Sequence, residues 1–396
     1  MKKYIFTIIS LGFILFSSCE QGNVLYQISL EQPPKTPLID GSPSSLVKTA
    51  NGLIYCANKT KLFVYEYENE KKWSRVSISG ASGRLVDIAA IDDTLFLLTE
   101  SGRTRTLYKG DSNATSKDSI TFAELTNGSR WTPASLMAAG NYIFAAGQAG
   151  STSEDYALLY SLASGSTLEW VETSANLPLA VGMLNDGTND RYYVSFAANA
   201  SGSGNGIKSA VPPEFSALAS LPIMPDSNLG SGKGFLAFYN VGNELIATAN
   251  SSLNNALIWK IQRDGSSGDS QKKSYTSVLF SRALGIWDDG TNKYLLIGRA
   301  NNYSSTSTYY YWGYYTLPIS GDSVDISGSL DTLGSAMGME GEAYNSSIGY
   351  YGIHSFVQAD SGGGTAGKLF ASTMNNGLWM LINNDGYQWE VVGDNE

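Results

Sequence analysis

The dipeptide Ala-Asn ends several short apolar segments of this sequence, and its spacing constrains the fold more than any other feature. It closes IYCAN at Ala57, VSFAAN at Ala198, LIATAN at Ala249 and LIGRAN at Ala300. The last three alanines are 51 residues apart. Self-similarity at a fixed period marks repeat architectures, and the segments are short and followed by turn residues. The spacing therefore predicts repeated units, each made of a few short strands.

One such unit begins at Leu46. LVKTA precedes Asn51-Gly52, a strong signal for a two-residue hairpin, and IYCAN follows as a second strand. A short polar loop leads to a third strand over 62–67, and a charged turn leads to a fourth strand that starts at Trp73. Each unit is therefore expected to be a four-stranded antiparallel sheet.

The same order recurs along the chain. First strands are expected to begin near Leu46, Leu85, Ala134, Ala180, Gly234, Ala283 and Ile353. Hairpins rich in Asn, Asp and Gly follow them at 51–52, 92–93, 140–141, 186–189, 242–243 and 289–292. Fourth strands are expected to carry an aromatic residue and, three places later, an aliphatic or small residue, starting at Trp73, Phe122, Trp170, Phe215, Tyr275 and Trp389.

A lone four-stranded sheet leaves apolar faces and edges in water, and stacking such sheets around an axis buries the faces. The repeated unit resembles the blade of a β-propeller. We therefore expect an all-β fold with a single domain over 46–396 and seven four-stranded blades, while six or eight blades stay open. The long spacing between the last two units predicts an insertion around 330–352. The segment 24–30 is an extra strand, expected to complete a sheet edge where the ring closes.

Residues 1–18 have the features of an export signal. Two lysines precede an uncharged apolar stretch of 13 residues, 4–16, which is short for a membrane span. The following Ser-Ser-Cys resembles the lipobox of bacterial lipoproteins, although Phe16 stands where Leu is usual. The resemblance implies a lipidated Cys19, a tether over 19–45 and attachment to a membrane of the bacterial cell envelope, periplasmic or surface-exposed. A plain secretory signal is the alternative.

The charge and the second cysteine restrict the chemistry further. The formal net charge is −10, and the basic clusters are no longer than Lys71-Lys72 and Lys272-Lys273. Because nucleic-acid binding depends on clustered Lys and Arg, we expect no nucleic-acid partner. Acylation of Cys19 would leave Cys56 without a disulfide partner, and its apolar neighbours predict a small buried side chain.

The sequence offers few groups for catalysis. His354 is the single histidine, and a zinc site or a Ser-His-Asp triad needs more partners than its neighbourhood supplies. The segment 384–389 resembles one degenerate Asp-box of sialidase-type propellers, where the box is a structural turn. Sialidase chemistry also needs an arginine cluster, and the nine arginines show no recurring placement at inner strands. We therefore expect no enzyme activity, no catalytic residue and no cofactor.

Two hairpins with the sequence DGTN, 186–189 and 289–292, bring carboxylates and carbonyls together. They offer too few oxygens in a fixed order for a calcium cage, and turn formation explains Asp, Gly and Asn at these positions. We therefore expect no metal.

The segment 309–315, YYYWGYY, is the densest aromatic run. Side chains alternate between the two faces of a strand, so packing between two neighbouring sheets is the first interpretation. A solvent-open platform for a sugar or peptide is the second. Its candidate ligand-binding residues are Tyr303, Tyr309, Tyr311, Trp312 and Tyr314.

Loops between second and third strands are rich in Ser, Asn and Gly, at 148–155, 199–206, 250–255 and 301–307. In a propeller they gather at one end of the ring, beside the mouth of the central channel. Recognition of a polar ligand and simple solvation explain them equally well. We expect a non-catalytic binding or scaffolding module for a protein or polysaccharide ligand, or a stabilising subunit of an envelope complex. The alternative is a glycan-active hydrolase or lyase, whose candidate carboxylates are Glu340, Glu342 and Asp360.

Overall fold

The computed structural model describes residues 38–393, with internal gaps at 67–71, 113–117, 151–154, 199–203, 205, 213, 225–226, 228, 230–233, 251–254, 263–270, 277, 300–312, 331–347, 349–351, 361–366, 375 and 384–387. The predicted signal peptide, Cys19, the extra strand at 24–30 and most of the insertion expected around 330–352 lie outside the described residues. None of the described helices is long and apolar enough to cross a membrane.

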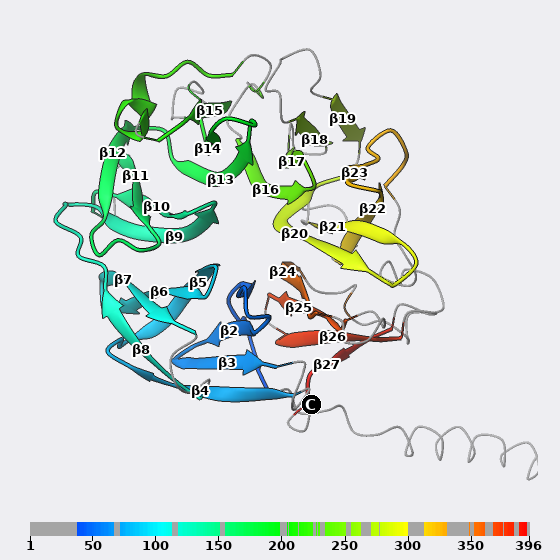
Figure 1. The fold of residues 1–396 in the computed structure, drawn as a ribbon, viewed down its shortest axis with the longest axis horizontal. Helices are drawn as coiled ribbons and strands as arrows, with labels where there is room; N and C mark the ends of the chain where they lie inside the picture. Colours follow the sequence, from blue (N-terminus) through cyan, green and yellow to red (C-terminus); the bar gives the residue numbers. More distant parts are fainter. Residues whose placement is uncertain are drawn as a thin grey trace, which may run out of the picture.

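The chain folds into successive antiparallel units of short strands (Figure 1). The first two units contain β1 (Leu46–Lys48), β2 (Ile54–Asn58), β3 (Lys61–Tyr65), β4 (Trp73–Ser79), β5 (Arg84–Ile91), β6 (Thr94–Ser101), β7 (Thr104–Asp111) and β8 (Ser119–Glu124). The next two contain β9 (Thr132–Ala139), β10 (Tyr142–Gln148), β11 (Tyr156–Leu162), β12 (Glu169–Ser174), β13 (Pro178–Asn185), β14 (Asp190–Phe196), β15 (Gly206–Ala210) and the 3₁₀-helix η1 (Glu214–Ser220).

The second half of the chain repeats the pattern. It contains β16 (Phe235–Val241), β17 (Glu244–Asn250), β18 (Asn255–Gln262), β19 (Gln271–Thr276), β20 (Phe280–Asp288), β21 (Lys293–Arg299), β22 (Tyr314–Ser320), β23 (Ser323–Val324), β24 (Ile353–Gln358), β25 (Leu369–Thr373), β26 (Leu378–Asn383) and β27 (Gln388–Val391). The predicted first strands and their hairpins are confirmed. The DGTN hairpins also form as turns, because Asp186 Oδ1 accepts hydrogen bonds from the backbone N–H groups of Thr188 and Asn189 at 2.9 and 2.8 Å.

Four units are separate four-stranded sheets, and the other units depart from the expected pattern. The units β1–β4 and β5–β8 form one eight-stranded sheet, because β4 and β8 pair in parallel, with Ser77 opposite Ser119. The unit β13–β15 has three strands. All-β architecture is confirmed, whereas the expectation of a four-stranded sheet in every unit is wrong.

The fourth strand predicted at Phe215 is wrong, because the 3₁₀-helix η1 stands in its place. Residues three apart point to opposite faces of a strand, but to the same face of a 3₁₀-helix. In β4, Trp73 faces one hydrophobic cluster and Val76 faces another, as a strand between two neighbours requires. Phe215 and Leu218 instead enter the same cluster. An aromatic residue followed three places later by an aliphatic one is therefore compatible with either element.

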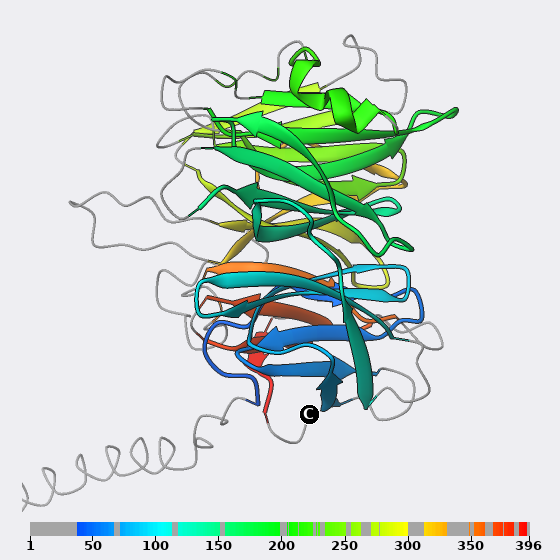
Figure 2. The same cartoon turned by 90° about the vertical axis from the view of Figure 1, so that its left-hand side faces the viewer.

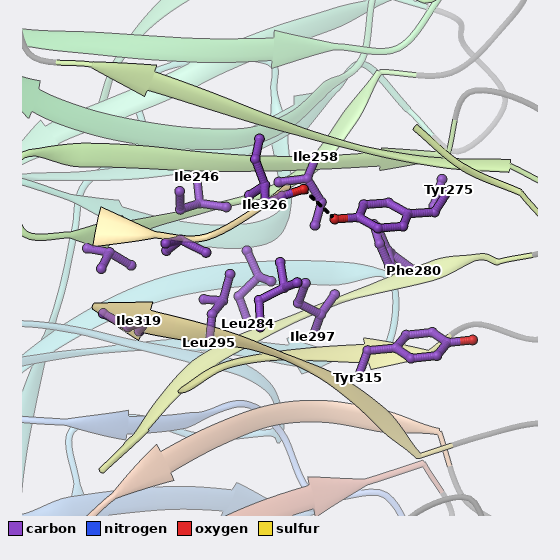
Figure 3. Close-up of a cluster of buried hydrophobic side chains, with 14 residues drawn as sticks. Ile246, Ile258, Tyr275, Phe280, Leu284, Leu295, Ile297, Tyr315, Ile319 and Ile326 are labelled. Carbon is purple, nitrogen blue, oxygen red and sulfur yellow. Dashed lines mark hydrogen bonds between the residues drawn. The ribbon is translucent and has the colours of Figure 1, made fainter. Parts of the chain in front are cut away.

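The first strands of the units surround the centre of the molecule (Figure 1). Neighbouring first strands contact one another in the order β1, β5, β9, β13, β16, β20, β24 and back to β1. The units stack as layers in the side view (Figure 2). The fold is a β-propeller. Hydrophobic side chains fill the spaces between successive sheets, as in the cluster that Ile246 and Ile258 form with Leu284, Leu295 and Ile297 (Figure 3).

Residues 38–41 help to close the ring. Leu38 N–H donates to Val392 O at 3.0 Å, and Gly377 N–H donates to Gly41 O at 2.7 Å, so this segment binds the unit of β24–β27 before the chain enters β1. Ile39 is fully buried among side chains of the first and last units. The sequence predicts a tether over 19–45, but the end of this range packs on the propeller.

Side chains of the inner strands also bind the backbone of neighbouring units. Asp87 on β5 accepts a hydrogen bond from Leu136 N–H of β9 at 3.0 Å, and Asn240 on β16 donates to Met183 O of β13 at 2.7 Å. Gln358 on β24 binds both the N–H and the C=O of Asp288 at 2.8 and 2.7 Å. Each bond supplements the burial of apolar area and fixes the position of one inner strand against the next.

Candidate functional site: the central cavity

A cavity of about 830 Å³ lies at the centre of the ring, at the end where the inner strands begin. Its walls come from the starts of β5, β13, β16, β20 and β24, from the middle of β9, and from residues 42–45 ahead of β1. The volume falls within the range of about 300–1,000 Å³ that is usual for small-molecule sites. The cavity is therefore large enough to hold a ligand.

The strand register relates this cavity to the polar loops. The last residues of second strands pair with the first residues of first strands, as Gln148 does with Thr132 and Ala249 with Phe235. The loops that follow β10, β14, β17 and β21 therefore leave from the cavity end, which agrees with the arrangement predicted from the sequence. Most of the residues in these loops lie outside the described part of the chain.

A bulge recurs at the cavity end of the inner strands. The register of β5, β9, β13, β16, β20 and β24 against the second strand shifts near the start of each. The extra residues are Val86, Ala134, Leu179, Leu236, the three residues 281–283, and His354. A bulge redirects side chains and is common beside functional sites. All of these residues except Ala134 and Ala283 line the cavity.

The two sides of the cavity differ in polarity. One arc, formed by β9, β13 and β16, presents partly exposed apolar side chains, which include Met137, Leu179, Leu236 and Phe238. The other arc, formed by β20, β24, residues 42–45 and β5, carries serines and charged or titratable groups. These groups are Lys59, Arg84, Asp87, Arg282 and His354.

Most charged groups of the polar arc have partners. Lys59 Nζ lies 3.1 Å from both carboxylate oxygens of Asp40, and Arg84 lies 2.8 Å from Glu100 Oε2. Asp87 accepts backbone hydrogen bonds from Ile88 and Leu136 at 2.9 and 3.0 Å. Desolvation nevertheless raises the pKa of the Asp87 carboxyl, against the opposing effect of these bonds and of the Arg282 charge.

Arg282 has a different environment. Its side chain is exposed at the bulge of β20 and contributes to the cavity wall. Within the described residues, no carboxylate lies within 4.0 Å of its guanidinium. The sequence shows no recurring arginine placement at inner strands, but the structure places Arg84 and Arg282 near the starts of two of them, β5 and β20. The sequence signal for this placement is that each arginine directly precedes a residue at which a first strand is expected to begin, Leu85 or Ala283.

His354 is the bulged residue of β24. The hydroxyl of Ser281 in the β20 bulge donates to the carbonyl of the preceding residue, Ile353, at 3.4 Å, so the two bulges touch. The His354 side chain is accessible from the cavity, but desolvation by the surrounding protein lowers the pKa of its imidazole. The lowered pKa favours the neutral form of the imidazole. The sequence predicts a structural or solvated role, and the structure adds a place in the cavity wall.

The aromatic candidates are placed differently. Tyr314 is 1% exposed and packs in the core, where its hydroxyl accepts a hydrogen bond from Trp389 Nε1 at 3.1 Å. Its neighbour Tyr315 enters a different cluster, so the two side chains point to opposite faces of β22. The prediction that Tyr314 belongs to a solvent-open ligand platform is therefore wrong. Its side chain packs between two sheets. Tyr303, Tyr309, Tyr311 and Trp312 lie outside the described residues.

Of the carboxylates proposed for glycan chemistry, the one that the structure describes, Asp360, does not line the cavity. Asp360 follows the end of β24, away from the cavity, and forms an ion pair with Lys48. Glu340 and Glu342 lie outside the described residues. Asp87 is the one carboxylate among the described residues that line the cavity. No group of three or more His, Cys, Asp or Glu in the described part of the chain is arranged to hold a metal ion.

No protein-family model and no curated protein matches the sequence. Solved structures do match. A chain of the mitotic checkpoint complex has a TM-score of 0.52 at 10% identity, covering 92% of this chain and 98% of that one. An ancestral GH74 enzyme has a TM-score of 0.51 at 15% identity, covering 90% of this chain and 47% of that one. The WD40 β-propeller domain of Doa1 has a TM-score of 0.49 at 12% identity, covering 91% and 98%.

What the first two of these proteins share with the chain is the fold. Identities this low say nothing of activity, and a propeller can serve as an enzyme or as a binding module.

Proposed function

We propose that the protein is a lipoprotein of the bacterial cell envelope, with a single seven-bladed propeller domain that serves as a non-catalytic binding or scaffolding module. Acylated Cys19 anchors it to the membrane, and the cavity end of the ring receives a protein or polysaccharide. The closed order of contacts among β1, β5, β9, β13, β16, β20 and β24 supports a count of seven blades. The lipobox-like Ser-Ser-Cys supports the anchor.

The composition of the cavity wall carries this proposal. Glycoside hydrolysis by the usual mechanism needs two carboxyl groups on either side of the bond that breaks. Asp87 is the one carboxylate among the described lining residues, and both its oxygens accept backbone hydrogen bonds. Because these two hydrogen bonds hold the Asp87 carboxylate against the backbone, it is better suited to stabilising the cavity wall than to transferring protons. Binding without turnover is therefore the function that the described residues favour.

A glycan-active hydrolase or lyase is the alternative. Arg84 and Arg282 favour it, because guanidinium groups bind sugar carboxylates. It requires a second carboxylate in the cavity, for which Glu340 and Glu342 are the candidates. Incubation of the full-length protein with envelope polysaccharides separates the two functions. Binding with no new chain ends supports a module, and multiple-turnover release of fragments contradicts it.

Photo-crosslinking tests which end of the ring binds. A photoreactive residue replaces exposed Asp155, beside the loop at the cavity end, or exposed Thr291, in a hairpin at the opposite end. We expect an adduct with one envelope component from position 155 and none from position 291. Equal labelling from both ends would contradict the proposed docking surface. Loss of membrane association in the Cys19→Ser variant tests the anchor separately.

A further inference from the structure

One half of the cavity wall is apolar, and the other half carries cationic side chains. We propose that the cavity binds a small organic acid with an apolar body, whose carboxylate meets Arg282 and whose body lies against Leu179, Leu236 and Phe238. This site goes beyond the proposed function, because it needs no macromolecular partner.

Arg282 provides the anion contact. Lys59 and Arg84 are matched by Asp40 and Glu100, whereas the described residues place no carboxylate at ion-pair distance from Arg282. A guanidinium binds a carboxylate through two parallel hydrogen bonds. The bulge sets the three residues 281–283 of β20 against Gly298 of β21 and carries the Arg282 side chain at the cavity wall. Asp87 is near enough to interact electrostatically with Arg282 but forms no ion pair with it, so an incoming carboxylate can supply the direct contact.

The apolar half lies on β13 and β16, the two first strands that precede β20 around the ring. Leu179 and Leu236 are themselves bulge residues of β13 and β16, and all three apolar side chains are only partly buried. Phe238 lies against Gly182, where a Cβ would approach the Phe238 Cβ to 2.7 Å. Glycine at position 182 thus makes room for the phenylalanine beside the cavity. Apolar area left in a concave wall gains free energy when a ligand covers it.

The two halves together select a class of ligand. A small inorganic anion would leave the apolar arc in water, and an uncharged apolar molecule would leave the guanidinium unpaired. An organic cation would meet Arg282 with like charge. The protein carries a formal net charge of −10, so an anion is repelled by much of the surface and attracted to this wall. An acid with one ring or a short alkyl chain fits a cavity of about 830 Å³.

Calorimetric titration tests the site with 4-phenylbutyrate as the probe. The full-length protein is held in lipid nanodiscs, and the heat of empty nanodiscs is subtracted. Three analogues separate the contributions: 4-phenyl-1-butanol lacks the charge, 4-phenylbutylamine reverses it, and acetate lacks the ring. We expect one phenylbutyrate per chain, bound at least about tenfold more tightly than any analogue.

Variants locate the binding. Arg282→Gln should weaken phenylbutyrate binding by at least about tenfold, Arg282→Lys should weaken it less, and Leu236→Asn should weaken it without changing the charge. Arg75→Gln is the matched control, since Arg75 is exposed on β4 away from the cavity. Equal melting temperatures of the two glutamine variants exclude unfolding as the cause. The proposal is overturned if the acid and the alcohol bind equally, if Arg282→Gln binds like the native protein, or if the acid does not bind at millimolar concentration.

Discussion

The ammonium group of Lys260 lies 2.9 Å from the carboxylate of Glu244 inside the propeller, where the two side chains are 6% and 9% exposed. Both groups also bind β23 of the next sheet. Lys260 donates to Ser323 Oγ and Val324 O at 2.8 and 3.1 Å, and Glu244 accepts from Ser323 Oγ and Val324 N–H at 2.9 and 3.1 Å. The pair therefore joins β17 and β18 to the edge of the neighbouring unit.

Removing one member of this pair should destabilise the protein strongly. Lys260→Met leaves the Glu244 charge buried without its partner, so we expect the free energy of unfolding to fall by about 3–5 kcal/mol. Urea unfolding followed by fluorescence measures the change. Lys293→Met is the control, because Lys293 pairs with Asp288 at 3.4 Å on the surface, with side chains 56% and 41% exposed. That change should cost less than about 1 kcal/mol, and equal losses in both variants would contradict the inferred role of the buried pair.

We expect the 3₁₀-helix η1, which stands where a fourth strand was predicted, to contribute strongly to the stability of the protein. Phe215 is 2% exposed, and its ring centroid lies 5.1–5.6 Å from four others, those of Tyr142, Phe144, Tyr160 and Tyr192. Phe215→Ala should lower the free energy of unfolding by about 3–5 kcal/mol. Exposed Ser216→Ala on the same helix should change it by less than about 0.5 kcal/mol. A small effect of Phe215→Ala would mean that η1 can leave the fold without cost.

The order of the strands was predictable because it depends on local chemistry. Asp186 and its neighbours form a turn through hydrogen bonds within four residues, and Tyr314 and Tyr315 reach opposite faces because side chains alternate on any strand. Such relations need no knowledge of the rest of the chain. The repeated spacing then indicated that the sheets are equivalent and must bury one another.

The cavity was less predictable, because it depends on pairing between strands. A bulge shifts the following side chains to the other face, and a single sequence does not mark where it occurs. The sequence therefore does not show that His354 lines the cavity, and the position of Arg282 before a first strand indicates its strand but not that its side chain lies at the cavity wall. The prediction of a strand at Phe215 fails for a related reason, since its spacing to Leu218 suits a strand or a 3₁₀-turn, and packing against the neighbouring aromatic rings decides between them.

The thiol of Cys56 should report on unfolding. The side chain is fully buried, as the sequence predicts, and burial raises the pKa of the thiol. Because the thiolate is the reactive form, a water-soluble disulfide reagent should not react with the folded Cys19→Ser variant and should label one thiol per chain in urea. A cysteine at exposed Thr60 in the same hairpin, with Cys56 replaced by serine, is the control and should react in the folded protein. Rapid labelling of native Cys56 would show that β2 separates from its neighbours.

Lastly, His354 should make the protein less stable as the pH falls. The lowered pKa in the folded state means that the unfolded chain, with an imidazole pKa of about 6.5, takes up the proton first. The free energy of unfolding therefore has its full value above that pH and falls below it, until the folded imidazole is also protonated. The raised pKa of Asp87 acts in the opposite direction. His354→Gln isolates the contribution of the histidine, because it leaves Asp87 in place. Urea unfolding at pH 7.5 and pH 5.5 should show a smaller loss of stability in His354→Gln than in the native protein, and equal losses would mean that the imidazole is solvated alike in both states.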